Sequence, residues 1–160
     1  LEHMGFLGCI ITQNIDNLHQ DGGSQDVIEF HGNMRQVVCQ SCQKLLPMSE
    51  ISLNNLPPYC PCGGVFKPNG VFFGEPIPSY ALSRAYAESQ QADVMLVIGT
   101  SAVVYPAAAM PGVAKEAGAQ IIEINPENTD LTGPISDFII QEKAGVAIPQ
   151  IVQVLKDMAS

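Results

Sequence analysis

The sequence is poor in charged side chains, and most of all in basic ones. Only 14% of its 160 residues are charged, and 7 lysines and arginines stand against 16 aspartates and glutamates, which gives a formal net charge of −9. Nucleic-acid binding depends on clustered basic side chains that neutralise phosphates, so a nucleic-acid surface is not expected. A small molecule or a basic peptide suits a chain of this charge better.

Long apolar runs are also missing. The run Val94–Ile98 is only long enough for a strand, whereas a helix that crosses a bilayer needs about 20 mostly apolar residues. No positively charged segment precedes an apolar one near the first residue, so a secretory signal is not indicated. We therefore expect no membrane partner and a cytoplasmic location.

The sequence does contain enough apolar residues, 46%, to build a packed core. Short β-rich runs alternate with segments of helical spacing, and this alternation is typical of an α/β fold with a parallel sheet. The run Val94–Ile98 is apolar without alternation, which indicates a strand covered on both faces. The expected strands are 9–12, 27–30, 71–73, 94–98, 120–124 and 137–141, and the expected helices are 79–91, 107–117 and 149–158.

Four of the five cysteines form two tight pairs, Cys39-x2-Cys42 and Cys60-x-Cys62. Two turns that each carry two thiols can place four thiolates around one Zn²⁺ at about 2.3 Å. Four protein ligands fill a tetrahedral coordination sphere, so such a zinc would be structural and not catalytic. Disulfides or unpaired buried thiols are the alternative readings of the same residues.

The cysteine-containing segment differs in composition from the rest of the chain. Residues 34–64 include few large apolar side chains and would bury little core of their own. We therefore predict a small zinc-binding module at 34–64, inserted into a main domain formed by residues 1–33 and 65–160.

Polar segments follow two of the expected strands. Gly99–Ser101 comes after the strand at 94–98, and Thr12–Asp16 comes after the strand at 9–12. In parallel α/β sheets ligands bind beyond the carboxyl ends of the strands, where backbone amides suit a phosphate or a ribose. The same residue types are common in turns, so both readings stay open at this point. His31 is equally open: it can act as a general base or as a hydrogen-bonded structural residue.

Taken together, these segments resemble the sirtuins, which are NAD-dependent protein-lysine deacylases. The segments occur in the family's order and spacing, and they cover essentially the whole chain. The resemblance implies a Rossmann-like parallel sheet with an inserted zinc ribbon. The matching segments are Thr12–Gln20, Phe30–Gly32, the two cysteine pairs, Lys67–Pro68, Phe73–Glu75, Gly99–Ser101 and Ile124–Asn125.

The resemblance implies a role for each matching residue. His31 is implied to be the catalytic base, and Cys39, Cys42, Cys60 and Cys62 the zinc ligands. The residues implied to bind the co-substrate NAD are Gln13, Asn14, Asp16, Gly99, Thr100, Ser101, Asn125 and Ala144. The residues implied to bind the acyl-lysine peptide are Val71, Phe72, Phe73, Gly74 and Glu75.

The implied reaction removes acyl groups from protein lysines and releases nicotinamide and O-acyl-ADP-ribose. An NAD-dependent mono-ADP-ribosyltransferase and a non-catalytic zinc module are the alternative functions. The chain departs from the family because the glycine-rich loop that covers the pyrophosphate of NAD has no match. We therefore expect the Rossmann-like domain to lack its first part, and this chain alone to bind NAD weakly, to turn over poorly and to self-associate through a sheet edge.

Overall fold

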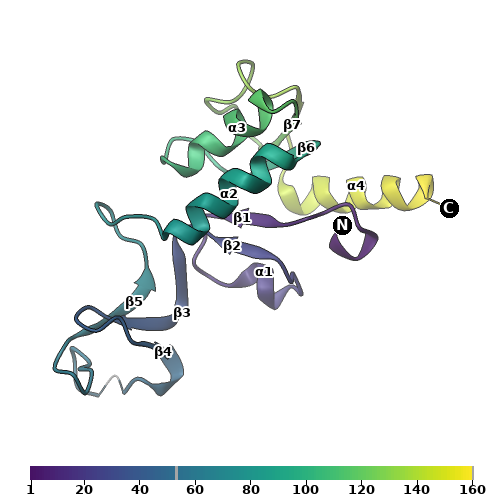
Figure 1. The fold of residues 1–160 in the computed structure, drawn as a ribbon. Coiled ribbons are helices and arrows are strands. Elements are labelled where there is room, and N and C mark those ends of the chain that lie inside the picture. The colour runs from purple at the N-terminus through teal and green to yellow at the C-terminus, as the bar shows by residue number, and fades with distance from the viewer. Residues whose placement is uncertain (53, 160) are drawn as a thin grey trace. The chain divides into compact units, whose positions relative to one another are not determined.

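The structure, a computed structural model, describes residues 1–52 and 54–159. Its Cα positions divide the chain into two compact units (Figure 1). The amino-terminal unit comprises Glu2 and residues 7–82, and the carboxyl-terminal unit comprises Leu1, His3–Phe6 and residues 83–159. The domain bounds predicted from composition stay a prediction.

The amino-terminal unit begins with two short parallel strands. β1 (Ile10–Thr12) pairs with β2 (Val27–Glu29) in register from Ile10 opposite Val27 to Thr12 opposite Glu29. The short helix α1 (Leu18–Asp21) lies in the connection, and its first backbone N–H donates to the Asp16 carboxylate at 3.1 Å. That bond satisfies one of the donors that a helix start leaves free. The strands expected near 9–12 and 27–30 are confirmed.

The same unit continues into an antiparallel sheet of order β4-β3-β5. Its strands are β3 (Gly32–Cys39), β4 (Leu45–Pro47) and β5 (Phe66–Gly70), with the 3-10 turn η2 (Met48–Glu50) after β4. The sheet therefore reaches beyond both bounds of the predicted 34–64 module. A small core fills it, made by the buried Val37, Cys39, Cys60 and Phe66 with Leu46, Met48 and Ile51 packed against them.

The strand expected at 71–73 is wrong, because the strand lies one segment earlier, at Phe66–Gly70. Pairing with β3 ends where the Val71 N–H donates to the carbonyl of His31 at 2.9 Å. The chain then turns back, since the Glu75 N–H donates to the Phe72 carbonyl at 2.9 Å. Phe73 is fully exposed, so the apolar run Val71–Phe73 is a surface loop and not part of a sheet.

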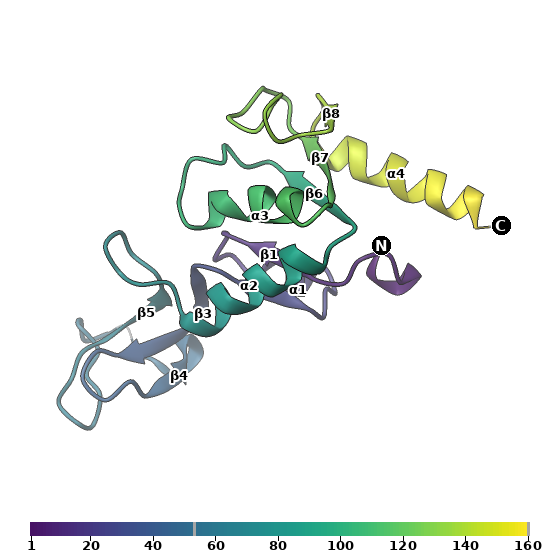
Figure 2. The same ribbon diagram turned by 45° about the horizontal axis from the view of Figure 1, so that its top comes forward.

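The carboxyl-terminal unit is built on a parallel sheet of order β6-β7-β8. The strands are β6 (Val94–Ile98), β7 (Gln120–Ile124) and β8 (Phe138–Ile140), close to the expected ranges. The 3-10 turn η3 (Ala107–Ala109) leads into helix α3 (Met110–Glu116), which lies against β6 and β7. Figure 2 shows this helix beside the two strands. The α/β class expected from the sequence is confirmed, with parallel sheets in both units.

Small and branched side chains form the core of this unit. Ala114 of α3 is completely buried, and the absence of a longer side chain there lets the helix approach the sheet. Gly118 follows α3 with a φ of +104°, the left-handed conformation that commonly ends a helix. The buried core residues are Val97, Ala102, Ala114, Ala119, Ile121 and Leu131, with Ala92, Met95 and Ile135 packed against them.

The remaining helices complete the fold. α2 (Ser79–Gln91) has the predicted bounds and contains the boundary between the two units, and η1 (Glu2–Met4) is a single 3-10 turn near the start. α4 (Ala144–Met158) begins five residues before the predicted start. The prediction began the helix at Pro149, whereas Pro149 lies inside it. A proline at this position removes one helical hydrogen bond, and its ring crowds the carbonyl four residues earlier. Across residues 1–52 and 54–159, none of the helices has both the length and the apolar character that a membrane span requires.

Strand β6 is less buried than its sequence suggests. We expected Val94–Ile98 to be covered on both faces, but Val94 is 48% exposed and Ile98 41% exposed. The reason is positional: within the described part of the chain, β6 forms one edge of its three-stranded sheet.

Candidate functional site

His31 lies in the tight turn that connects β2 to β3. The preceding Phe30 is completely buried and its ring meets the imidazole edge-on, at a centroid distance of 5.7 Å. The following Gly32 has a φ of +70°, and a Cβ atom on it would lie 2.0 Å from the carbonyl oxygen of Asn69. A buried anchor on one side and a position that accepts only glycine on the other hold the His31 backbone in one place.

One ring nitrogen of His31 has a defined partner. Nδ1 lies 3.3 Å from the backbone carbonyl oxygen of Gln13. A carbonyl oxygen only accepts, so Nδ1 must carry the proton in this contact. In the neutral ring the lone pair is then on Nε2, and this is the tautomer that a general base needs.

The polar loop after β1 lies beside this turn. The Phe30 N–H donates to the Thr12 carbonyl at 3.0 Å, and the Met34 N–H donates to the Ile15 carbonyl at 3.2 Å. The Thr12 hydroxyl accepts from the Asn14 N–H at 3.1 Å, which turns the chain so that Asn14 is exposed. The structure thus brings together the loop residues Gln13, Asn14 and Asp16 and the His31 turn, which the sequence had singled out separately.

The loop after β5 starts at the same place. The Val71 N–H donates to the His31 carbonyl, so Val71–Glu75 leads away from the histidine. Lys67 fixes the far end of this loop: its Nζ lies 2.6 Å from the Glu75 carboxylate, 3.1 Å from the Gly70 carbonyl oxygen and 4.9 Å from the centre of the Phe72 ring. The hydrogen bond from Lys67 lowers the pKa of Glu75 below its ordinary value. The aromatic side chains of the loop are therefore presented at the surface by a fixed turn.

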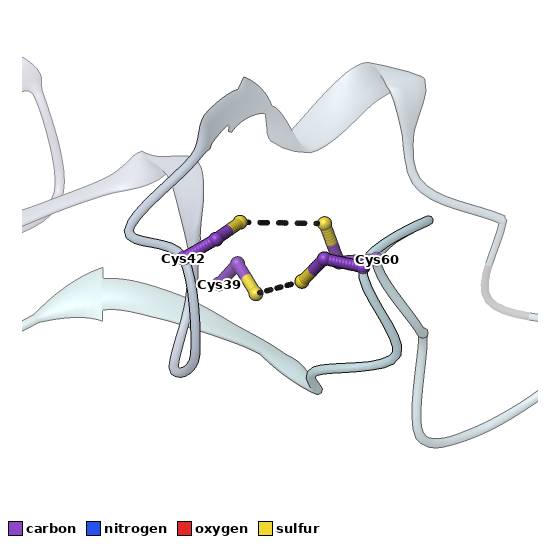
Figure 3. A group of neighbouring side chains, drawn as sticks. Cys39, Cys42 and Cys60 are labelled. Atoms are coloured by element: carbon purple, nitrogen blue, oxygen red, sulfur yellow. Dashed lines mark hydrogen bonds between the residues drawn. The ribbon is translucent and has the colours of Figure 1, made fainter.

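The four paired cysteines converge (Figure 3). The sulfur of Cys39 lies 3.5 Å from that of Cys62, the sulfur of Cys42 lies 3.7 Å from that of Cys60, and all four lie within 4.8 Å of one another. These sulfurs are not bonded as disulfides, since all five cysteines are free. Four ligands at about 2.3 Å from one tetrahedral ion would be about 3.8 Å apart, so the cluster is suited to zinc.

The electrostatics of the cluster point the same way. The backbone N–H of Cys42 is the main cause that lowers the pKa of Cys39, to about 6. For Cys42 the backbone N–H of Lys44 acts to lower the pKa, but the thiols of Cys62 and Cys39 raise it to about 12. One thiolate thus forms easily and disfavours a second beside it, and a divalent cation at the centre relieves that repulsion.

A glycine makes room for this arrangement. A Cβ atom on Gly64 would lie 2.7 Å from the Cys39 sulfur and 2.5 Å from the Ser41 hydroxyl. The carbonyl of Gly64 accepts from the Cys60 N–H at 2.7 Å, and the Gly63 N–H donates back to the Cys60 carbonyl at 2.8 Å. The second cysteine pair therefore sits in a turn whose close approach to the first pair requires glycine.

The carboxyl-terminal unit has a polar groove at the carboxyl ends of its strands. The groove measures about 420 Å³. Asn125 joins two of the strand ends, because its side-chain amide donates to the Thr100 carbonyl at 3.0 Å. The lining residues are Gly99, Thr100, Ser101, Val103, Asn125, Glu127, Asn128, Thr129 and Asp130.

The groove contains four of the residues singled out from the sequence and five that were not. Gly99, Thr100, Ser101 and Asn125 were singled out, whereas Ala144, the first residue of α4, is not among the lining residues. The missed residues are Val103, Glu127, Asn128, Thr129 and Asp130. A polar run directly after a buried strand is the signal that could have identified most of them.

The chain is similar in sequence to proteins of a known family. A model of the Sir2 family matches residues 1–106. The chain is 48% identical over 149 residues to an NAD-dependent protein deacylase of Aquifex aeolicus, which covers 92% of this chain and 62% of that protein. It is 43% identical over 165 residues to an NAD-dependent protein deacylase of Thermococcus kodakarensis, which covers 99% of this chain and 64% of that one. The chain thus spans less than two thirds of the length of these relatives.

Solved structures give the same result. A crystal structure of a Sir2 homologue in complex with NAD matches with a TM-score of 0.93 and 44% identity, over 100% of this chain and 62% of that one. A Sir2–p53 peptide–NAD⁺ structure matches with a TM-score of 0.89 and 34% identity, over 99% and 67% of the two chains. With a family match over most of the chain, close relatives at this identity and the same fold, the chain belongs to the Sir2 family.

Proposed function

We propose that this protein removes acyl groups from protein lysines and consumes NAD in the reaction. The observation that carries the proposal is the His31 turn, where the Gln13 carbonyl fixes the tautomer that leaves Nε2 free to accept a proton. Relatives that are 41–48% identical are named NAD-dependent protein deacylases or deacetylases, which supports the same activity here.

His31 acts at the second half of the reaction. The acyl oxygen of the substrate lysine attacks the ribose carbon that nicotinamide leaves. Nε2 of His31 then takes a proton from a ribose hydroxyl, and this hydroxyl oxygen attacks the acyl carbon. With one water consumed, the products are free lysine, nicotinamide and O-acyl-ADP-ribose. The Gln13 contact keeps the imidazole in place through the transfer, and positioning of this kind is a main source of catalytic rate.

In this proposal NAD is bound by two sets of residues, one in the loop after β1 and one in the polar groove. Polar residues of the loop after β1 bind the nicotinamide and its ribose: the half-buried Gln13 and the exposed Asn14 and Asp16. The polar groove takes the adenosine half through Gly99, Thr100, Ser101 and Asn125, with a backbone contact from Ala144. The groove fits such a ligand because strand-end amides, hydroxyls and an amide side chain line it. Sir2 homologues solved with NAD and with ADP-ribose support this assignment.

The acyl-lysine peptide binds along Val71, Phe72, Phe73, Gly74 and Glu75. An extended peptide docks on such a loop through main-chain hydrogen bonds, so affinity depends little on its side chains. The hydrogen bond from the Val71 N–H to the His31 carbonyl supports this assignment, because it joins the start of the loop to the residue proposed as general base. A Sir2 enzyme bound to a propionylated peptide and one bound to a p53 peptide support a peptide as the partner.

Zinc has a structural role in this proposal. Cys39, Cys42, Cys60 and Cys62 use every tetrahedral position, so no position remains for substrate. The ion replaces the large apolar core that this part of the chain lacks.

The test compares His31→Asn with His19→Asn in the complete gene product. His19 is a matched control, because it is a histidine of the same unit and lies in α1, outside the His31 turn. With NAD and an acetyl-lysine peptide, we expect His31→Asn to lower the rate of O-acetyl-ADP-ribose formation by about 10²–10⁴-fold, the usual contribution of a general base. His19→Asn should stay within about twofold of the unaltered protein.

Two results would overturn the proposal. Unchanged turnover in a folded His31→Asn variant would remove the histidine from the reaction. Transfer of ADP-ribose to protein, without O-acyl-ADP-ribose, would favour the mono-ADP-ribosyltransferase instead. Melting temperature and bound zinc measured in both variants separate a chemical effect from unfolding.

A further inference from the structure

Glu123 is a buried carboxylate that the proposed reaction does not use. It lies in the central strand β7 and is only 1% exposed. Side chains two apart in a strand point to the same face, so Glu123 shares its face with the core residue Ile121. Burial of an ionised carboxylate among apolar side chains is costly unless hydrogen bonds replace its water.

The loop between β7 and β8 supplies those hydrogen bonds. Both oxygens of Glu123 accept from hydroxyls: Ser136 donates at 2.7 Å, Thr132 lies at 2.9 and 3.1 Å from the two oxygens, and Thr129 also donates. Among the described residues, none of the ion pairs includes Glu123. Burial acts to raise the pKa of Glu123, but the three hydroxyls outweigh it and hold the pKa below its ordinary value, so the group is ionised at neutral pH.

Two of the hydroxyls also order the backbone of the loop. The Thr129 hydroxyl accepts from the Leu131 N–H at 3.1 Å, and the Thr132 hydroxyl accepts from the Thr129 N–H at 2.9 Å. Each hydroxyl therefore links the carboxylate to a backbone amide. Because hydrogen bonds to an ionised acceptor are stronger than neutral ones, the conformation of the loop depends on the charge of Glu123.

The ordered loop is one wall of the polar groove. Glu127, Asn128 and Asp130 line the groove from it, and Thr129 both lines the groove and donates to Glu123. Gly99–Ser101, at the end of β6, also lines the groove. The Glu123 carboxylate is therefore buried behind this wall, and Thr129 connects the two, since Thr129 both donates to the carboxylate and lines the groove.

We propose that Glu123 is a positioning residue for nucleotide binding, which fixes the 127–130 wall of the groove through Thr129, Thr132 and Ser136. This inference rests on the proposed function, since the ligand it names is the adenosine half of NAD. Glu123 touches no substrate: it acts through the loop that does.

The test uses Glu123→Gln, which keeps the size of the side chain but replaces one acceptor oxygen with a donor. Glu116→Gln is the control, because Glu116 is an exposed glutamate at the end of α3 in the same unit. Ser136→Ala and Thr132→Val remove one hydroxyl each and leave the carboxylate in place. They keep the test decisive if Glu123→Gln fails to fold.

Two measurements on the full chain are read together: hydrogen exchange of residues 126–136 and the dissociation constant for ADP-ribose. Loss of a hydrogen bond to a charged group corresponds to roughly 10-fold or more, so we expect exchange in the loop to rise by about that factor. Exchange in β6 and β7 should stay within about twofold, and ADP-ribose binding should weaken by about 10-fold. The hydroxyl variants should give smaller changes in both quantities, and Glu116→Gln none.

The other outcomes are equally informative. Unchanged loop exchange in Glu123→Gln, or a rise that is equal in β6 and β7, would overturn the positioning role and leave a purely structural one. A selective rise in loop exchange in a chain whose unaltered form binds no ADP-ribose would overturn the nucleotide groove of the proposed function and keep Glu123 as the residue that orders the loop.

Discussion

Gly32 and Gly70 face each other across β3 and β5, and they should respond in opposite ways to the same substitution. In Gly32→Ala the new Cβ would lie 2.0 Å from the Asn69 carbonyl oxygen, and Cβ atoms essentially never approach other atoms within 3.0 Å. The strands must therefore separate by about 1 Å. In Gly70→Ala the nearest atom is the His31 carbonyl oxygen at 3.8 Å, an ordinary contact.

The magnitudes differ for two physical reasons. Gly32 has a φ of +70°, and alanine in the left-handed region costs about 1–2 kcal/mol. Overpacking adds about 1–3 kcal/mol, so Gly32→Ala should lower the free energy of unfolding by about 2–5 kcal/mol. Gly70 has no such conformation, and alanine there should be neutral or raise the free energy of unfolding by up to about 1 kcal/mol, because it restricts the unfolded chain.

Urea unfolding followed by circular dichroism gives both free energies, and the rate of the proposed deacylation gives the effect on His31. A separation of the strands also strains the hydrogen bond from the Val71 N–H to the His31 carbonyl, so Gly32→Ala should lose activity even where it remains folded. Equal stabilities of the two variants, within about 0.5 kcal/mol, would refute the close approach of β3 and β5 at Gly32.

Removal of zinc by a chelator, or the substitution Cys60→Ser, should unfold the region around β3–β5, because structural zinc contributes on the order of 10 kcal/mol in small zinc-binding peptides. Elemental analysis that finds no zinc in metal-replete protein would contradict this prediction. The pKa of Glu123 is lowered in the folded chain, so this carboxylate stabilises the fold above pH 4.5, the ordinary pKa of glutamate, and the stabilisation is lost as the pH falls through the lowered pKa. In Glu123→Gln the free energy of unfolding should therefore depend less on pH in that range. The exposed Phe138 and Ile139 of β8 should promote self-association, so light scattering should show a mass that rises with concentration and falls in Phe138→Lys, whereas a constant monomer mass would exclude it.

The sequence was most informative where one physical signal dominates. The unbroken apolar run Val94–Ile98 and the isoleucine-rich segment Gln120–Ile124 predicted β6 and β7, and helical spacing predicted both ends of α2. The spacing of the cysteines predicted their convergence, because two short turns restrict where four sulfurs can lie.

The segments whose secondary structure was predicted wrongly are those where the local preference of the residues and the tertiary strand pairing disagree. Phe66–Gly70 contains a lysine, a proline and an asparagine and looks like a loop, yet pairing with β3 makes it a strand. Val71–Phe73 has the apolar character of a strand, but within the described part of the chain it forms none, and only the Val71 N–H continues the pairing by donating to the His31 carbonyl. The groove wall at 127–130 depends on Glu123, and no local pattern reveals that a charged residue in a strand will be buried and joined to hydroxyls 6 to 13 residues away.

The cysteine cluster also determines where the chain can vary in length. The two pairs are separated by the 17 residues between Cys42 and Cys60, and a metal bound to both pairs closes this segment at its base. Loop-closure entropy grows only with the logarithm of loop length, so each doubling of the segment costs about 0.6 kcal/mol. Insertions between Cys42 and Cys60 should therefore be tolerated far better than a change of one residue within either pair, and related chains can diversify their surface there without disturbing the His31 turn.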